Sequence, residues 1–418
     1  MYSKEATPEQ ELIKVLGGKS EKDPFLVFKE LRDNGAVRPI PMQIGNTDNQ
    51  TWIATQMDEV KTVLKDQDTF CVDPSTINKE SNTRSELTNS SDNPNSNLFL
   101  ANSLNAIDEP DHRRLRRLVS KGFTPRYMES LRPKVQGIAD DLIDQVQEKG
   151  EMDIVQDFAY KLPIIVISEM IGVPNSDQEQ IYHWSESIAN GLGLGRLDEE
   201  VSKSLDEFGN YFKQLIAERR QQPKDDLISD LVSIEDGGDK LHEKELLSLV
   251  QLLIFAGHET TSNLISTGTL MLLDNPKQLE TLRNDLSLVP KAVEELLRFH
   301  GPSTTAGPRY VIKDTVLGGQ NIKKGDIVFP LLKSANRDEN VFSSSEDLDV
   351  TRHIKRHVAF GHGVHMCLGA PLARIEGDIA FTTLIKRLPD MKLNVPRENI
   401  QWQFKLAAQG LSSLPVSF

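Results

Sequence analysis

The chain has 418 residues, a formal net charge of −14 at pH 7 and two cysteines. Its length allows a large buried core, and its acidic charge argues against general binding to nucleic acid. Two cysteines argue against a disulfide framework and suit a reducing compartment. The N-terminus lacks the apolar core of a signal peptide, and no apolar run approaches the ~20 residues of a membrane span. We therefore expect an acidic, soluble protein of the cytoplasm.

The N-terminal part of the chain predicts short helices and strands followed by a loop. Trp52–Thr55 alternates weakly, as a strand does, whereas Met57–Asp66 places its apolar residues on one side, as an amphipathic helix does. From Pro74 to Asn97 the composition turns to Asn, Ser, Thr and Asp. Such a segment can bury little apolar surface, and it predicts a mobile surface loop.

Basic residues gather on the helix predicted over Asp108–Arg117. A proline and an aspartate near its start are a standard signal for a helix N-terminus. His112 and Arg116 are four residues apart and therefore share a face, and Arg113 and Arg117 share an adjacent one. By itself, a basic cluster on a helix indicates no more than a solvated face.

The strongest helical pattern covers Leu246–Leu273 and is ended by Asn275–Pro276. A helix of about 30 residues is about 45 Å long and can cross a whole domain. One stripe along it begins apolar and ends in a carboxylate and a hydroxyl: Leu252, Phe255, Ala256, Glu259 and Thr260. A buried carboxylate is costly unless it is paired or takes part in chemistry. The plain alternative is that Glu259 belongs to a structural network and that the Thr260 hydroxyl donates to the Ala256 carbonyl.

Another helix is predicted over Pro290–Phe299, where Glu295 and Arg298 lie on one face. Such a pair means little alone, because exposed helix pairs are common and contribute little to stability. The next segment, Pro302–Asp326, predicts short strands joined by glycine-rich turns. The C-terminal segment Trp402–Phe418 predicts a terminal hairpin.

The stretch His357–Arg374 contains Cys367, which lies between a glycine-rich loop and a predicted helix from Leu368 onward. The N–H groups and the dipole at a helix start favour a thiolate over a thiol. Gly363 allows a turn that a side chain would block, and Gly369 lets the backbone approach a flat ligand closely. A lone thiolate held in this way can be the axial ligand of a heme iron.

Two other interpretations of the cysteine remain open at this point. Cys367 could be a small buried hydrophobe, which is the commoner fate of a lone cysteine. Alternatively, it could form a compact zinc or copper site with His362 and His365.

The cysteine loop resembles the F-x-x-G-x-x-x-C-x-G heme loop of the cytochrome P450 family, through Phe360, Gly363, Cys367 and Gly369. Two further motifs occur in the order typical of that family. The sequence AGHETT, which begins at Ala256, resembles the family's oxygen-activation sequence. Glu295 and Arg298 match its E-x-x-R, a buried pair that braces the cysteine loop. With the propionate residues given below, the resemblance covers nearly the whole chain.

This resemblance implies a mainly α fold with a minor β part, in which a long central helix lies over a heme. It implies a single domain over residues 1–418, without a reductase domain. Cys367 would ligate the iron of heme b, Gly257 beside Ala256 would leave room for dioxygen, and Glu259 and Thr260 would relay protons. The heme propionates would be bound by His112, Arg116, Arg309 and His365. The substrate pocket would be lined by Leu98, Phe99, Leu252, Phe255, Thr304, Thr305 and Ala408.

The implied reaction is the hydroxylation or epoxidation of a small lipophilic molecule with O2. Because the sequence has no flavin or nicotinamide fingerprint, a separate ferredoxin or flavodoxin with its reductase would supply the electrons. Arg113, Arg117 and Lys121 would then point outward and form a dock for this acidic partner. The absence of a membrane anchor resembles the bacterial branch of the family.

Two rival functions differ in what they require. A peroxide-driven peroxygenase needs no redox partner, but such enzymes generally lack the pair formed here by Glu259 and Thr260. A non-catalytic heme-based ligand sensor would need an output module, and none is visible in the sequence.

Overall fold

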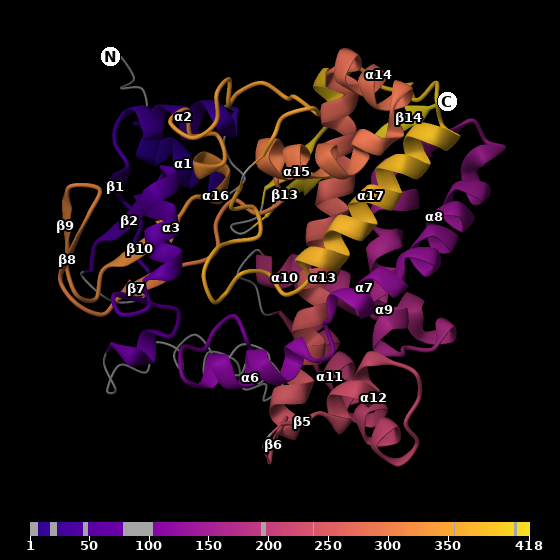
Figure 1. Ribbon diagram of the computed structural model, residues 1–418, viewed down its shortest axis with the longest axis horizontal. Coiled ribbons are helices and arrows are strands. Elements are labelled where there is room, and N and C mark those ends of the chain that lie inside the picture. The colour runs from indigo at the N-terminus through magenta and orange to yellow at the C-terminus, as the bar shows by residue number, and fades with distance from the viewer. Residues whose placement is uncertain are drawn as a thin grey trace. The chain divides into compact units, whose positions relative to one another are not determined.

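The structure is a computed structural model that describes residues 7–16, 23–44, 49–77, 103–193, 198–236, 238–354, 356–404 and 408–418. The chain divides into two compact units, and Figure 1 labels many of their helices and strands. Unit 1 comprises Met1–Thr83, Thr267–Cys367 and Gln401–Ser412. Unit 2 comprises Arg84–Ser266, Leu368–Ile400 and Ser413–Phe418. Each unit therefore combines three stretches that are distant in the sequence.

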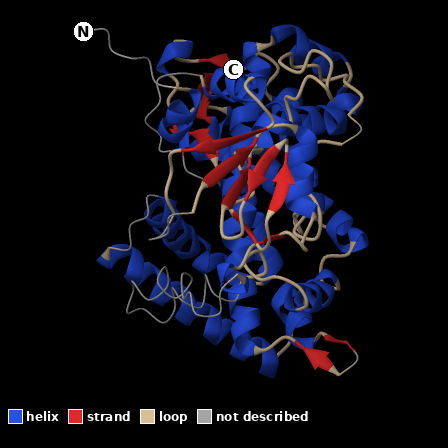
Figure 2. Ribbon diagram, turned by 90° about the vertical axis from the view of Figure 1, so that its left-hand side faces the viewer, coloured by secondary structure: helices blue, strands red, loops and turns tan. Residues whose placement is uncertain are grey.

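A mixed sheet of five strands organises unit 1, and its strands lie side by side in Figure 2. The strands are β1 (Val37–Ile40), β2 (Thr51–Ala54), β3 (Phe70–Cys71), β7 (Arg309–Val311) and β10 (Ile327–Pro330). Their order is β1-β2-β10-β7-β3, in which β2 and β10 are parallel and the other neighbours are antiparallel. The strand predicted over Trp52–Thr55 is confirmed as β2, one residue earlier at each end.

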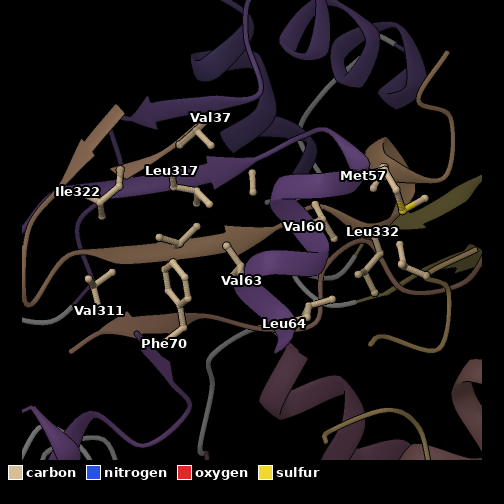
Figure 3. Close-up of a cluster of buried hydrophobic side chains, with 14 of the residues drawn as sticks. Val37, Met57, Val60, Val63, Leu64, Phe70, Val311, Leu317, Ile322 and Leu332 are labelled. Atoms are coloured by element: carbon tan, nitrogen blue, oxygen red, sulfur yellow. The ribbon is translucent and has the colours of Figure 1, made fainter. Parts of the chain in front are cut away.

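Helix α3 (Met57–Lys65) packs against this sheet, as Figure 3 shows. Its Val60 and Val63 side chains are buried in one cluster with Val311 from strand β7. The one-sided apolar pattern of Met57–Asp66 is therefore confirmed as the face that a helix presents to a sheet.

The other elements of unit 1 are short helices and two hairpins. The helices are α1 (Pro8–Leu16), α2 (Pro24–Asp33), α14 (Pro276–Asn284), α15 (Val289–His300) and α16 (Leu332–Ala335), with 3-10 turns at Pro74–Thr76 and Leu286–Leu288. The hairpins pair β8 (Thr315–Leu317) with β9 (Gln320–Ile322), and β12 (Trp402–Phe404) with β13 (Gln409–Leu411). Local sequence explains the start of α2: the Asp23 side chain accepts from the Phe25 N–H, and Pro24 occupies the first turn.

Unit 2 consists mostly of helices. They are α6 (Asp111–Ser120), α7 (Pro125–Ser130), α8 (Arg132–Gln147), α9 (Lys161–Ile171), α10 (Gln178–Gly193), α11 (Glu199–Gln221), α12 (Leu227–Ser233) and α17 (Ala370–Arg387), with a π-helical segment at Ile154–Ala159 and 3-10 turns at Asn175–Asp177 and Arg397–Asn399. A three-stranded sheet has the order β11 (Lys392–Leu393), β14 (Pro415–Ser417) and β4 (Glu151–Asp153). A small hairpin pairs β5 (Glu235–Asp236) with β6 (Asp239–Lys240).

Helix α13 (Glu243–Asp274) begins in unit 2 and ends in unit 1. It contains the predicted helix Leu246–Leu273 and stops, as predicted, before Asn275–Pro276. The elements as a whole confirm a mainly α fold with a minor β part. In the part of the chain that the structure describes, no helix is long and apolar enough to cross a membrane.

The C-terminal segment differs from the terminal hairpin predicted over Trp402–Phe418. Strand β13 pairs with β12, whereas β14 pairs with β4 and β11. The Asp153 carboxylate accepts hydrogen bonds from the Ser413 hydroxyl and from the Leu414 N–H, the latter at 3.0 Å. These bonds hold the last residues beside β4, so they leave the hairpin.

Candidate active site

The cysteine loop of unit 1 has a defined backbone conformation. The Cys367 N–H donates to the Phe360 carbonyl at 2.9 Å, and the Met366 N–H donates to the Gly363 carbonyl at 3.2 Å. Gly363 has a φ of 75°, and a Cβ there would lie 2.5 Å from the Leu64 carbonyl oxygen. Both the left-handed backbone and this close approach require glycine. The loop therefore holds Cys367 in place through bonds made by Cys367 itself and by the residue before it.

The surroundings of Cys367 decide between the interpretations that the sequence left open. Cys367 is exposed, whereas Cys71 is buried in the core, so the interpretation of Cys367 as a small buried hydrophobe is wrong. Within residues 356–404 and the other described ranges, no three His, Cys, Asp or Glu side chains form a group that could hold a metal ion. A compact zinc or copper site with His362 and His365 is therefore also wrong. A single exposed sulfur fits one axial ligand to a heme iron.

The electrostatic environment beside the loop is positive. Burial lowers the pKa of His362, and the charges of Lys61, Lys65 and Arg356 lower it further. Positive charge near a cysteine stabilises the thiolate. Helix α17 begins at Ala370, two residues later than predicted, with Pro371 in its first turn.

A buried ion pair lies in α15. The Arg298 Nε and Nη2 atoms donate to the two Glu295 carboxylate oxygens at 2.7 and 2.8 Å, and both side chains are fully buried. Arg298 also donates to the carbonyls of Asn336, Ser345 and Asp347. The Arg352 Nε donates to Glu295 at 3.1 Å and completes a group of three charges.

Hydrogen bonds connect this ion pair to the cysteine loop. Arg298 donates to the Asn336 carbonyl at 3.0 Å, and the Asn336 side-chain oxygen accepts from the Val358 N–H at 2.8 Å. Val358 is two residues before Phe360, whose carbonyl accepts from Cys367. The ion pair and the cysteine are thus joined by a short path within unit 1.

The carboxylate and hydroxyl of α13 lie in the unit 2 part of that helix. Glu259 and Thr260 are both partly exposed, so the costly buried carboxylate expected from the pattern is not present. The Thr260 hydroxyl donates to the Ala256 carbonyl at 2.7 Å, which is the local bond of the plain alternative. A Cβ at Gly257 would lie 3.6 Å from Ile167, an ordinary contact, so packing in unit 2 does not itself require glycine there.

The apolar candidates on α13 are partly buried. Phe255 is partly buried, and its ring lies 5.2 Å from the Phe208 ring of α11. Leu252 is also partly buried, whereas Ala256 is exposed. His258, to which the sequence assigned no role, is 1% exposed, and its ring lies 4.9 Å from the Tyr160 ring.

Each unit contains two of the four residues predicted to bind the heme propionates. In unit 2, His112 and Arg116 are four residues apart on α6, so they share a face as predicted. Burial lowers the pKa of His112, and the Arg116 charge lowers it further. In unit 1, Arg309 is buried and donates to the Ala306 and Pro308 carbonyls at 3.1 Å each. His365 is partly buried in the cysteine loop.

The structure brings three of the candidate pocket residues together in unit 1. Thr304 and Thr305 are buried, and Ala408 forms a β-bridge with Ser303. The Thr305 hydroxyl is buried and has no hydrogen-bond partner among the described residues. Leu98 and Phe99 lie outside the described residues.

One buried acid was missed by the sequence patterns. Glu376 on α17 is fully buried, and burial raises its pKa to about 8 although the Thr261 hydroxyl donates to it. Thr261 follows Thr260 directly in the chain. The sequence could have predicted this burial, because Glu376 lies at helical spacing from the apolar residues Leu372 and Ile379.

Comparisons with known proteins show the family to which the chain belongs. The sequence profile of the cytochrome P450 family matches residues 192–403. PksS of Bacillus subtilis, a polyketide biosynthesis cytochrome P450, is 40% identical over 401 residues, which cover 96% of this chain and 97% of PksS. Cytochrome P450 CYP107DY1 of Priestia megaterium is 43% identical over 369 residues, covering 88% of this chain and 89% of the relative.

A solved structure of Bacillus subtilis PksS superposes on this chain with a TM-score of 0.86 and 38% identity, covering 99% of both chains. The fold of a bacterial cytochrome P450 is thus shared over 99% of this chain. The chain belongs to the cytochrome P450 family. It is a monooxygenase, and its cofactor is heme b.

Proposed function

We propose that this protein hydroxylates or epoxidises a small lipophilic molecule, with Cys367 as the thiolate ligand of its heme. The heme, when bound, supplies the iron at which dioxygen is activated, and a thiolate ligand favours cleavage of the O–O bond. The observation that carries the proposal is the exposed Cys367, held by its N–H bond to Phe360 in a loop that only glycine at position 363 allows.

Carbon monoxide tests the ligand directly. The reduced wild-type protein is expected to give the red-shifted Soret band of a thiolate-ligated carbon monoxide adduct, because the thiolate donates electron density to the iron. Cys367→His should lose this band, and Cys71→Ala, which changes the buried cysteine, should keep it. A globin-like band in the wild type would contradict the assignment.

The substrate class is supported by two observations. Leu252 and Phe255 offer apolar side chains on α13, and Thr304, Thr305 and Ala408 gather in unit 1. PksS is named for polyketide biosynthesis, which supports a lipophilic secondary metabolite as the substrate here. Spectral titration with a library of lipophilic molecules would identify ligands that displace water from the iron. A library in which only polar molecules bind would contradict this class.

Proton delivery is assigned to Glu259 and Thr260. The Thr260 hydroxyl donates to the Ala256 carbonyl at 2.7 Å, and its oxygen keeps lone pairs that can accept another hydrogen bond. Glu259 is partly exposed, so its carboxyl can exchange protons with solvent and resupply the hydroxyl.

Thr260→Ala is expected to keep heme and substrate binding but to divert most of the consumed electrons to hydrogen peroxide. The reason is that the helix loses the hydroxyl that would hand on the proton. The measurement is product formed per NAD(P)H consumed. Thr281→Ala is a matched control, because Thr281 makes the same local bond to Lys277 at 2.9 Å on exposed α14. Full coupling in Thr260→Ala would remove the relay role.

A ferredoxin or flavodoxin is proposed as the electron donor. Arg113 and Arg117 on α6 have side chains that are 79% and 57% exposed, although Arg113 contacts Glu109 at 2.9 Å. Exposed positive charge on a protein of net charge −14 would orient an acidic partner.

Arg113→Glu with Arg117→Glu should slow reduction of the heme by the donor about tenfold or more at low salt, because charge reversal removes electrostatic steering. Ligand binding should not change. The measurement is stopped-flow reduction, with Arg220→Glu on α11 as the control. An unaltered rate would remove this dock, and equal turnover with hydrogen peroxide alone would indicate a peroxygenase instead.

A further inference from the structure

Lys333 lies in α16 with its side chain only 2% exposed. Its ammonium Nζ donates to the Gln409 side-chain oxygen at 2.5 Å, and Gln409 is itself 3% exposed. Within the described part of the chain, Lys333 makes no salt bridge with a carboxylate. Burying a lysine beside a neutral amide is costly, so its hydrogen bond to Gln409 is the contact that offsets part of this cost.

The remaining neighbours of Lys333 do not neutralise it. The Phe25 ring lies 5.7 Å from Nζ and is also covered by the Arg337 guanidinium at 3.6 Å. Burial lowers the pKa of Lys333 well below its usual value, and the Arg337 charge lowers it further. Arg337 already has a carboxylate partner in Glu346 at 2.5 Å. The amide of Gln409 is therefore the polar contact that fixes the amine.

Leu332 and Lys333, the first two residues of α16, each hold a different segment of unit 1. The Leu332 N–H donates to the Thr304 carbonyl at 2.9 Å, and the Lys333 side chain holds Gln409. The Gln409 N–H in turn donates to the Pro302 carbonyl at 2.9 Å, and the preceding Ala408 bridges Ser303. Segments 302–305 and 408–409 are thus fastened to each other and to the first two residues of α16.

We propose that Lys333 is a positioning residue for the substrate site, which sets the placement of Ala408 and Gln409 relative to Thr304 and thereby selects which molecules fit. This inference rests on the proposed function, which places Thr304, Thr305 and Ala408 beside the substrate. The unpartnered Thr305 hydroxyl in the same segment supports a polar contact with a bound molecule.

The chemistry explains why a lysine is suited to this task. Its long stem packs among apolar side chains while its terminal donor reaches an acceptor on another segment. A methionine would fill a similar volume but would leave the buried Gln409 oxygen without its donor. The fastening of segment 408–409 to α16 would then be lost while the core stays filled.

Two probe ligands separate the substrate site from the iron. Imidazole is small and binds the iron alone, whereas 4-phenylimidazole also carries a ring that reaches the pocket wall. Lys333→Met should weaken 4-phenylimidazole binding by about tenfold, the value of one hydrogen bond, and change imidazole binding by less than about twofold. Gln409→Leu should give the same result, and the double variant should add no further loss, because both changes break one bond. Gln409→Glu, made in the protein that still has Lys333, keeps an acceptor for the lysine and should therefore bind 4-phenylimidazole nearly as the wild type does.

A matched control removes packing without removing the bond. Phe25→Leu replaces the ring beside Lys333 with a smaller side chain and leaves Gln409 in place. It should therefore lower stability without changing the ratio of the affinities for 4-phenylimidazole and imidazole. An equal change of that ratio in Phe25→Leu, or an unchanged ratio in Lys333→Met, would overturn the proposal.

Hydrogen exchange gives a readout that does not need the heme. Amide exchange at residues 409–411 should accelerate at least about tenfold in Lys333→Met and in Gln409→Leu, while exchange in α3 stays as in the wild type. If wild-type protein binds no thiolate-ligated heme, the proposed function fails and the exchange result still decides whether Lys333 fastens this segment. If the wild-type heme is normal but Lys333→Met changes neither the two ligand affinities nor the exchange at residues 409–411, only the present inference fails.

Discussion

Glu295→Leu is expected to destabilise the protein by about 3–5 kcal/mol, because it leaves the charge of Arg298 buried without its partner. Arg298 has no access to solvent, and Arg352 loses its contact with Glu295 at the same time. The weakened path through Asn336 and Val358 should also loosen the cysteine loop. The measurements are the free energy of unfolding in denaturant and the fraction of heme retained after gel filtration.

Two further variants sharpen this result. Glu294→Gln changes a partly exposed neighbour that contacts His357 at 3.1 Å, and it should cost well under about 1 kcal/mol. The double variant Glu295→Leu with Arg298→Met should recover only part of the loss, since the carbonyls of Asn336, Ser345 and Asp347 stay without their donor. A stability of Glu295→Leu close to that of the wild type would show that the pair does not brace the fold.

Glu376→Gln is expected to stabilise the protein strongly at alkaline pH and hardly at all at acid pH. The carboxyl has a pKa of about 8 in the folded protein against 4.5 for the ordinary group. The folded state therefore keeps a proton that the unfolded state releases, so rising pH favours unfolding across this window. The cost is absent below the ordinary pKa and reaches about 5 kcal/mol above the raised one.

Thermal unfolding at several pH values measures this effect. The wild type should lose stability between about pH 5 and pH 8, whereas Glu376→Gln, whose amide can still bond with Thr261, should lack this component. Glu398→Gln changes an exposed acid of unit 2 and serves as the control. Parallel pH profiles for wild type and Glu376→Gln would contradict a protonated Glu376 in the folded state.

Elements with strong local signals were predictable from sequence. The helix Leu246–Leu273 and the helix Pro290–Phe299 are present with ends shifted by one to three residues, because apolar spacing and proline act locally. The cysteine loop was also recognisable, since the glycine at position 363 is required by backbone geometry. The fold class followed from these local features and from the resemblance to a family.

Features that depend on long-range contacts were not predictable. Lys333 resembles any surface lysine in its local sequence, and its buried hydrogen bond is made with Gln409, which is distant in the chain. Strand β14 pairs with β4 with the help of the Asp153 carboxylate, which is distant in the chain. The local pattern therefore predicted a hairpin instead. The exposure of Glu259 could not be read from helical spacing alone, because spacing identifies a face but not what covers it.

The division of the C-terminal segment between the units affects how the chain can fold during synthesis. Residues 401–412 contribute β12 and β13 to unit 1, and residues 413–418 contribute β14 between β11 and β4 of unit 2. Domains commonly fold one after another as they emerge from the ribosome. Among the described strands, neither unit has its full set until this last segment has emerged. A premature stop codon near residue 400 would therefore leave both units incomplete.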